Sequence, residues 1–148
     1  MEVPSDDGSL HLLQYVVTSW TPQDHRRLRV NGHDPAAQPL WGAYILYLAV
    51  LTWSDFLVQH AGPPVFRGDA EGMLQAVVFR RARCAPLNTL IVELSLLLGG
   101  SIHDVRAVHW WSEKNSVCDA QRRSSEGVPI PQVLSDARPD TVVRRPWA

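Results

Sequence analysis

Apolar positions follow a helical period most clearly between Leu87 and Leu98. Leucines and one isoleucine recur there three or four positions apart, and polar residues fall on the opposite side. Pro86 stands where the first turn of a helix tolerates proline, and the pair Gly99 and Gly100 provides a stop. The pattern therefore predicts a helix over this segment.

A longer apolar segment, Leu40–His60, contains no proline and predicts the longest helix of the chain. Pro39 precedes it, and a run rich in glycine and proline, 61–64, follows it. Its first residues, about twelve of them, are apolar on nearly every side apart from Gly42. Such a helix needs cover on several sides, which the rest of the domain, a second polypeptide or lipid can provide.

Lipid is the less favoured environment for the apolar surface of this helix. A membrane span needs about twenty apolar residues, whereas the uninterrupted apolar stretch has about twelve and is followed by the polar Thr52, Ser54 and Asp55. A membrane-associated subunit anchored by residues 40–58 is therefore kept only as an alternative.

A second copy of the chain is the favoured partner for the apolar surface of this helix. A helix of about twenty residues is about 30 Å long, which is more than one small sheet covers. We therefore expect a homodimer or a higher homo-oligomer, although each contact candidate also suits an ordinary core position. The candidate interface residues are Trp41, Tyr44, Leu48 and Trp53.

Four segments favour extended backbone. Residues 10–20 mix β-branched, aromatic and leucine positions, and residues 27–30 run into a turn dipeptide. Residues 73–83 are apolar in their first half and end in arginines, and residues 102–111 alternate apolar and polar positions. The segment 62–72, which carries prolines and glycines, is expected to be a loop.

The order of these elements predicts the fold class. A strand, a helix and a strand across residues 73–111 make a βαβ unit with parallel strands, and the earlier helix and strand offer a second unit. We therefore expect an α+β fold, a two-layer ferredoxin-like sandwich with the helices on one face of a mixed four-stranded sheet.

This fold also predicts the domain boundaries. Residues 26–118 would form a single α+β domain, after an N-terminal extension, 1–25, with room for an extra strand. The composition of residues 119–148, which is polar and then proline-containing, predicts a flexible C-terminal tail.

Composition and charge narrow the class of protein. The 148 residues are 45% hydrophobic, which matches the size and content of one domain. The formal net charge is −1, so nucleic acid and membranes are not expected as partners unless a local patch binds them. One candidate patch would combine arginines and tryptophans, as sheet-based RNA-binding modules do. It consists of Arg80, Arg81, Arg83, Arg106, Trp110 and Trp111.

The cysteines and the N-terminus bear on location. Two cysteines, Cys84 and Cys118, are too few for a disulfide framework. The acidic N-terminal residues lack the charge and apolar pattern of a signal peptide. We therefore expect an intracellular protein.

The sequence contains few candidate reactive groups. The six histidines are scattered, and no spacing predicts a phosphate-binding loop or a zinc site. Cys84 follows Arg83 at the start of a helix, which would activate a thiol, but a small apolar packing role is favoured. We expect no catalytic residue, no cofactor and no metal. The alternative is a small enzyme or ligand-binding domain with a pocket lined by Cys84, His103 or His109.

Several short runs and their order carry a family resemblance. They are Leu28-Arg29-Val30-Asn31-Gly32, Trp53 with Asp55, Glu71-Gly72, Arg81-Ala82-Arg83-Cys84, Leu87 to Leu98 and Val105 to Val108. In these features the chain resembles the adenoviral early-region-four open-reading-frame-three proteins. The resemblance implies a small nuclear α+β protein that dimerises, assembles into networks through an exchanged C-terminal segment and captures host regulatory proteins by multivalent binding.

Three features depart from that family. The chain has an N-terminal extension, a Gly99-Gly100 turn where the family has a polar residue, and two prolines, Pro129 and Pro131, that would interrupt a donated strand. These departures weigh against higher assembly but not against a dimer. The resulting expectation is a non-enzymatic interaction protein, viral and located in the host nucleus, that oligomerises and captures host regulatory proteins.

Overall fold

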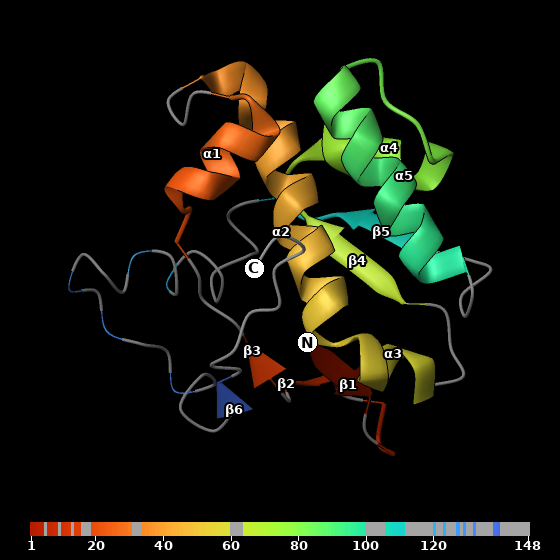
Figure 1. Ribbon diagram of the computed structural model, residues 1–148. Helices are drawn as coiled ribbons and strands as arrows, with labels where there is room; N and C mark the ends of the chain where they lie inside the picture. The colour runs from red at the N-terminus through yellow and green to blue at the C-terminus, as the bar shows by residue number, and fades with distance from the viewer. Residues whose placement is uncertain are drawn as a thin grey trace. The chain divides into compact units, whose positions relative to one another are not determined.

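The computed structural model describes residues 1–4, 6–8, 10–12, 14–15, 19–30, 34–59, 64–99 and 106–111, and a few positions after them (120, 123, 127, 129, 132, 138 and 139). The chain divides into two compact units. Unit 1 consists of Met1–Ser19 with Ser112–Val143, and unit 2 of Trp20–Trp111 with Arg144–Ala148. Figure 1 shows the helices and strands of both units.

Unit 1 contains short strands. β1 (Glu2–Pro4) and β2 (Leu10–Leu12) pair antiparallel, and Gly8 adopts a positive φ of 80° in the turn between them. β3 (Gln14–Tyr15) pairs in parallel with β6 (Arg138–Pro139). Two strands thus lie within the segment 10–20, where a strand was predicted, and one lies within the predicted tail.

Unit 2 begins with α1 (Pro22–Leu28), where the prediction of extended backbone over residues 27–30 is wrong. Thr21 caps this helix, because its side chain accepts a hydrogen bond from the Asp24 N–H (3.2 Å) while its own N–H donates to Asp24 Oδ2 (2.7 Å). Arg29 ends the helix in the left-handed conformation, with a φ of 53°. A capping box and a proline at the first helical position therefore decide the structure of this segment.

The predicted long helix 40–60 is confirmed as helical but is divided in two. A 3₁₀ turn, η1 (Pro35–Ala37), leads into α2 (Gln38–Thr52), and α3 (Ser54–Gln59) follows. Trp53 interrupts the helix, although its N–H still donates to the Ala49 carbonyl (2.9 Å). Among the residues that the structure describes, no helix is long and apolar enough to cross a membrane.

The predicted strand 73–83 is wrong, because α4 (Glu71–Phe79) occupies most of it. A strand buries every second residue, whereas a helix buries residues one, three and four positions apart. The buried residues of α4 follow the helical spacing: Met73, Leu74, Ala76 and Val77.

α4 ends in a Schellman motif. Arg80 is left-handed, with a φ of 54°; its N–H donates to the Val77 carbonyl, and the Arg81 N–H donates to the Ala76 carbonyl (3.1 Å). The arginines predicted to end a strand therefore form the turn after a helix.

The predicted helix 87–98 is confirmed as α5 (Ala85–Gly99). The Cys84 carbonyl accepts the Asn88 N–H at 2.8 Å, so Cys84 stands at the start of the helix. Five apolar residues of its inner side are buried: Leu87, Leu90, Ile91, Leu94 and Leu98. They pack against α2 and α4, and these three helices form the core of unit 2.

A two-stranded parallel sheet completes unit 2. β4 (Val65–Gly68) lies in the segment that was expected to be a loop, and β5 (Arg106–His109) lies in the predicted strand 102–111, of which 102–105 are outside the described residues. β4 and β5 pair in parallel, with Val65 opposite Arg106 and Gly68 opposite His109. α4 and α5 form the crossover between them.

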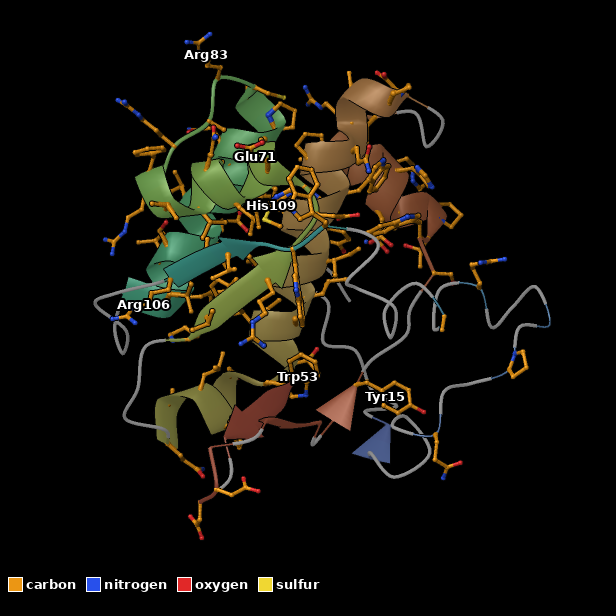
Figure 2. The ribbon with its side chains drawn as sticks, turned by 180° about the vertical axis from the view of Figure 1, so that it is seen from behind. Tyr15, Trp53, Glu71, Arg83, Arg106 and His109 are labelled. Carbon is orange, nitrogen blue, oxygen red and sulfur yellow. The ribbon has the colours of Figure 1, made fainter. Side chains whose placement is uncertain are left out.

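The ferredoxin-like prediction is therefore wrong. In the described part of the chain no four-stranded mixed sheet is present, because α1 ends within one segment assigned to it, 27–30, and α4 occupies most of another, 73–83. α2 and α5 lie on one face of β4 and β5: they stand in front of the strands in Figure 1 and behind them in Figure 2. Unit 2 is mostly helical, with a two-stranded parallel sheet in place of the predicted four-stranded mixed sheet.

Candidate functional site

The β4–β5 sheet has one face that the helices of unit 2 do not cover. Burial alternates along both strands: the first and third side chains of each strand are exposed, and the second and fourth are partly buried. The exposed positions are Val65 and Arg67 on β4, and Arg106 and Val108 on β5. The Trp110 N–H donates to the Gly68 carbonyl (2.8 Å), which extends the strand pairing by one residue beyond β5. Trp110 comes two positions after Val108, so it lies on the same side of the sheet. We call these five residues the open face.

Charge and apolar surface alternate across the open face. Val65 stands opposite Arg106, and Arg67 stands opposite Val108, so each cross-strand pair joins one valine to one arginine. The two valines are 46% and 45% exposed. Parallel strands are normally covered on both faces, and a two-stranded sheet is marginally stable by itself. The open face is therefore unusual for a parallel sheet.

One guanidinium of the open face has a fixed neighbour. The Cζ atom of Arg67 lies 5.2 Å from the ring centre of Trp110, within the range of a cation–π contact. This contact restricts the side chain of Arg67 and places positive charge above the end of the strand. A guanidinium carries five N–H donors, so contacts within the chain leave it able to bind further acceptors.

His109 and Trp111 lie beside the open face, on the other side of β5. The His109 Nε2 atom is 3.2 Å from the Asp69 carbonyl oxygen, and since a carbonyl only accepts, Nε2 is the donor in this contact. The rings of His109 and Trp111 meet edge to face at 4.5 Å. Trp111 is 66% exposed, but it lies on the side of β5 opposite to the open face.

The predicted arginine and tryptophan patch is divided by the structure. Arg80, Arg81 and Arg83 belong to the turn between α4 and α5, whereas Arg106 is on the sheet. Figure 2 shows Arg83 and Arg106 well apart in unit 2. Arg67, which no pattern in the sequence singled out, is the arginine that joins Arg106 on the open face.

Two of the four candidate interface residues lie in the core. Tyr44 is 0% exposed and Leu48 is 2% exposed within the single chain. Trp41 is half-buried between Trp20, whose ring centre is 4.5 Å away, and His25 at 5.1 Å. Trp53 is half-buried at the break between α2 and α3. Most of the apolar surface of α2 is therefore covered by the chain itself.

A buried polar contact fixes α1 against α2. Asp24 is fully buried, and its Oδ1 atom accepts a hydrogen bond from the Tyr44 hydroxyl at 2.7 Å. Its second oxygen accepts the Thr21 N–H, as described above. In the described residues, every buried side-chain nitrogen or oxygen atom has a hydrogen-bond partner.

Tyr47 connects α2 to α5. Burial, a hydrogen bond to Glu93 and the negative charge of that carboxylate raise the pKa of Tyr47 from its usual 10.0 to about 12. The phenol is therefore neutral throughout the physiological range, and this contact belongs to the core rather than to a reactive site.

The candidate reactive residues are not brought into one described cavity. Cys84 is exposed at the start of α5, His109 is on β5, and His103 lies outside the described residues. Within the described ranges no three histidine, cysteine, aspartate or glutamate side chains are grouped to hold a metal ion. No family model, curated protein or solved structure matches the chain.

Proposed function

We propose that the chain is a non-enzymatic interaction protein that binds another polypeptide on the open face of its β4–β5 sheet. The observation that carries this proposal is the exposure of Val65 and Val108 on a parallel sheet whose other face is covered. A bound segment would cover both valines and provide the covering layer that parallel strands normally have on their second face.

The test is selection of peptides from a random displayed library on the purified chain. Clones retained by the wild type are then measured against the double variant Val65→Ser and Val108→Ser. We expect retained clones to lose at least tenfold in affinity on the variant, while its thermal midpoint stays close to that of the wild type. Retention of no clone, or equal binding to the variant, would contradict the proposal.

Self-association is a second candidate function, and the outer side of α5 supports it. Three apolar residues near the end of this helix are exposed: Val92 (45%), Leu96 (75%) and Leu97 (42%). Val92 and Leu96 are four positions apart, so they lie together on one side of the helix. A second copy of the chain, packed helix to helix, would remove this surface from water.

Light scattering after size-exclusion chromatography tests this second candidate. We expect a dimer for the wild type and a monomer for Leu96→Glu, while Val58→Glu, which changes an equally apolar and exposed residue of α3, leaves the dimer intact. A monomeric wild type at micromolar concentration would contradict it. A viral origin, a nuclear location and host regulatory proteins as partners are further proposals, which rest on the family resemblance alone.

A further inference from the structure

We infer that a second copy of the chain packs antiparallel on α5, so that the α4–α5 turn of each copy lies beside the carboxyl end of the partner's α5. This inference rests on self-association, the second candidate function above, because it names the arrangement of the partner on the same helix. Its basis is a row of exposed residues along α5 and two exposed arginines just before the helix.

The exposed row repeats at the period of a coiled coil. Ala85, Thr89, Val92 and Leu96 are exposed, and successive members are four, three and four positions apart. This spacing places them along one line, which is about 16 Å long at 1.5 Å per residue. The buried residues of α5 fall on the other side of the helix. The row is therefore separate from the side of α5 that packs in the core.

Covering the row with apolar surface buries no charge. The Thr89 hydroxyl already donates to the Ala85 carbonyl within the helix (3.1 Å), so it needs no acceptor from a partner. Glu93, the one charged residue of α5, hydrogen-bonds to Tyr47 of α2, so its carboxylate is turned toward the chain's own core. The row thus suits a helix-to-helix contact.

The sizes of the side chains favour the antiparallel direction. If the twofold axis passes midway between Thr89 and Val92, Ala85 meets the partner's Leu96, and Thr89 meets the partner's Val92. A small side chain then faces a large one, and two of intermediate size face each other, so the separation of the two helices stays even. A parallel copy would place alanine against alanine and leucine against leucine, which leaves a gap at one end.

The charges favour the same direction. Arg81 and Arg83 are exposed just before α5, and Figure 2 shows Arg83 at the outer tip of the turn. α5 has no basic side chain in its own last turn, where the terminal carbonyl groups carry negative partial charge. In an antiparallel pair the arginines of one copy lie near this end of the partner's helix. In a parallel pair the arginines of both copies would meet and repel.

The experiment measures the dimer dissociation constant of the full chain by sedimentation equilibrium at micromolar concentrations, beginning with an exchange of side-chain sizes. Ala85→Leu should crowd the partner's Leu96, and Leu96→Ala should leave a gap at the same contact, so each should weaken the dimer about tenfold. The double variant again sets a small side chain against a large one and should recover most of the loss.

A reversal of charge tests the second argument. Arg83→Glu should weaken the dimer about tenfold, because the change acts at both ends of the pair, and added salt should reduce the difference from the wild type. Arg27→Glu, at an exposed arginine of α1, is the matched control and should leave the dissociation constant unchanged. Thermal melting of each variant verifies that it is folded.

Three outcomes would overturn the inference. A dimer that Leu96→Glu dissociates but that Ala85→Leu and Arg83→Glu tighten would be parallel, which keeps self-association on α5 and refutes the direction alone. Additive losses from the two size changes, with no recovery in the double variant, would refute the contact between Ala85 and the partner's Leu96. A monomeric wild type would refute self-association itself, and the antiparallel arrangement with it.

Discussion

The α1–α2 contact and the open face of the β4–β5 sheet use similar side chains in opposite ways. At the α1–α2 contact, the Trp20 ring lies 4.5 Å from Trp41 and 5.6 Å from Tyr44, and the Tyr44 hydroxyl donates to the buried Asp24. On the open face, a tryptophan contacts an arginine at the surface, and the valines beside them are nearly half exposed.

The difference separates stability from binding. In the first region the chain supplies the partner of each group, so a substitution there removes contacts that hold the fold. In the second region the two valines are exposed, so under the proposed function a substitution there should change binding rather than stability. Aromatic content alone did not distinguish these two uses; burial does.

The largest expected effect comes from Tyr44→Glu. Tyr44 was a candidate interface residue, but it is 0% exposed and its hydroxyl donates to the Asp24 carboxylate. A second carboxylate in that position is buried without a partner and removes the aromatic packing, so we expect a loss of about 4 kcal/mol or more and unfolding of unit 2. Circular dichroism and urea denaturation measure it. A folded variant of near wild-type stability would break the comparison.

A smaller loss is expected from Asp24→Ala. The change removes the acceptor of both the Thr21 N–H and the Tyr44 hydroxyl, and the helix cap with it. We expect a cost of about 2–3 kcal/mol in the free energy of unfolding. Arg26→Ala, at an exposed position of the same helix, is the control and should cost less than about 0.5 kcal/mol. Equal costs for the two would show that the polar contact contributes little.

Alkaline pH should weaken the core through Tyr47. Its pKa is about 12 in the folded chain and about 10 when unfolded, so the unfolded state loses this proton first and binds fewer protons between these values. The contribution to stability is complete below pH 10 and is lost as the pH rises from about 10 to about 12. Tyr47→Phe should flatten the fall in unfolding free energy over this range, and absorbance of the tyrosinate band locates the titration. A slope unchanged by the substitution would contradict the assignment.

The smallest effect on stability is expected from Val108→Ser. Val108 is 45% exposed, so we expect the free energy of unfolding to change by less than about 0.5–1 kcal/mol. The same variant should lose about tenfold in affinity for peptides selected on the wild type. A large loss of stability would mean that this face belongs to the core, and the contrast with the α1–α2 contact would disappear.

The sequence predicted α5 because its leucines are spaced so regularly that no strand could bury them on one side. It misassigned α4, because Val77, Val78 and Phe79 favour strands by propensity although the burial spacing is helical. It missed β4, which has only four residues between proline and glycine-containing turns. Such a strand exists because β5 pairs with it, and that pairing joins residues far apart in the chain.

The long separation of β4 and β5 in the chain also limits how much of the candidate site could be predicted. Arg106, Trp110 and Trp111 were singled out from an alternating segment. Arg67 was not, because a strand partner about forty positions away leaves no local pattern. Trp41 and Tyr44 were chosen for their size and apolar surroundings, which fit the core and an interface equally well.

The register of β4 with β5 has a consequence for chain closure. Since α4 and α5 lie between the two strands in the chain, pairing Val65 with Arg106 closes a loop of about forty residues, which costs conformational entropy. The open face therefore exists only while this loop is closed, and local opening of the sheet would separate the two valines that we propose as its contact surface.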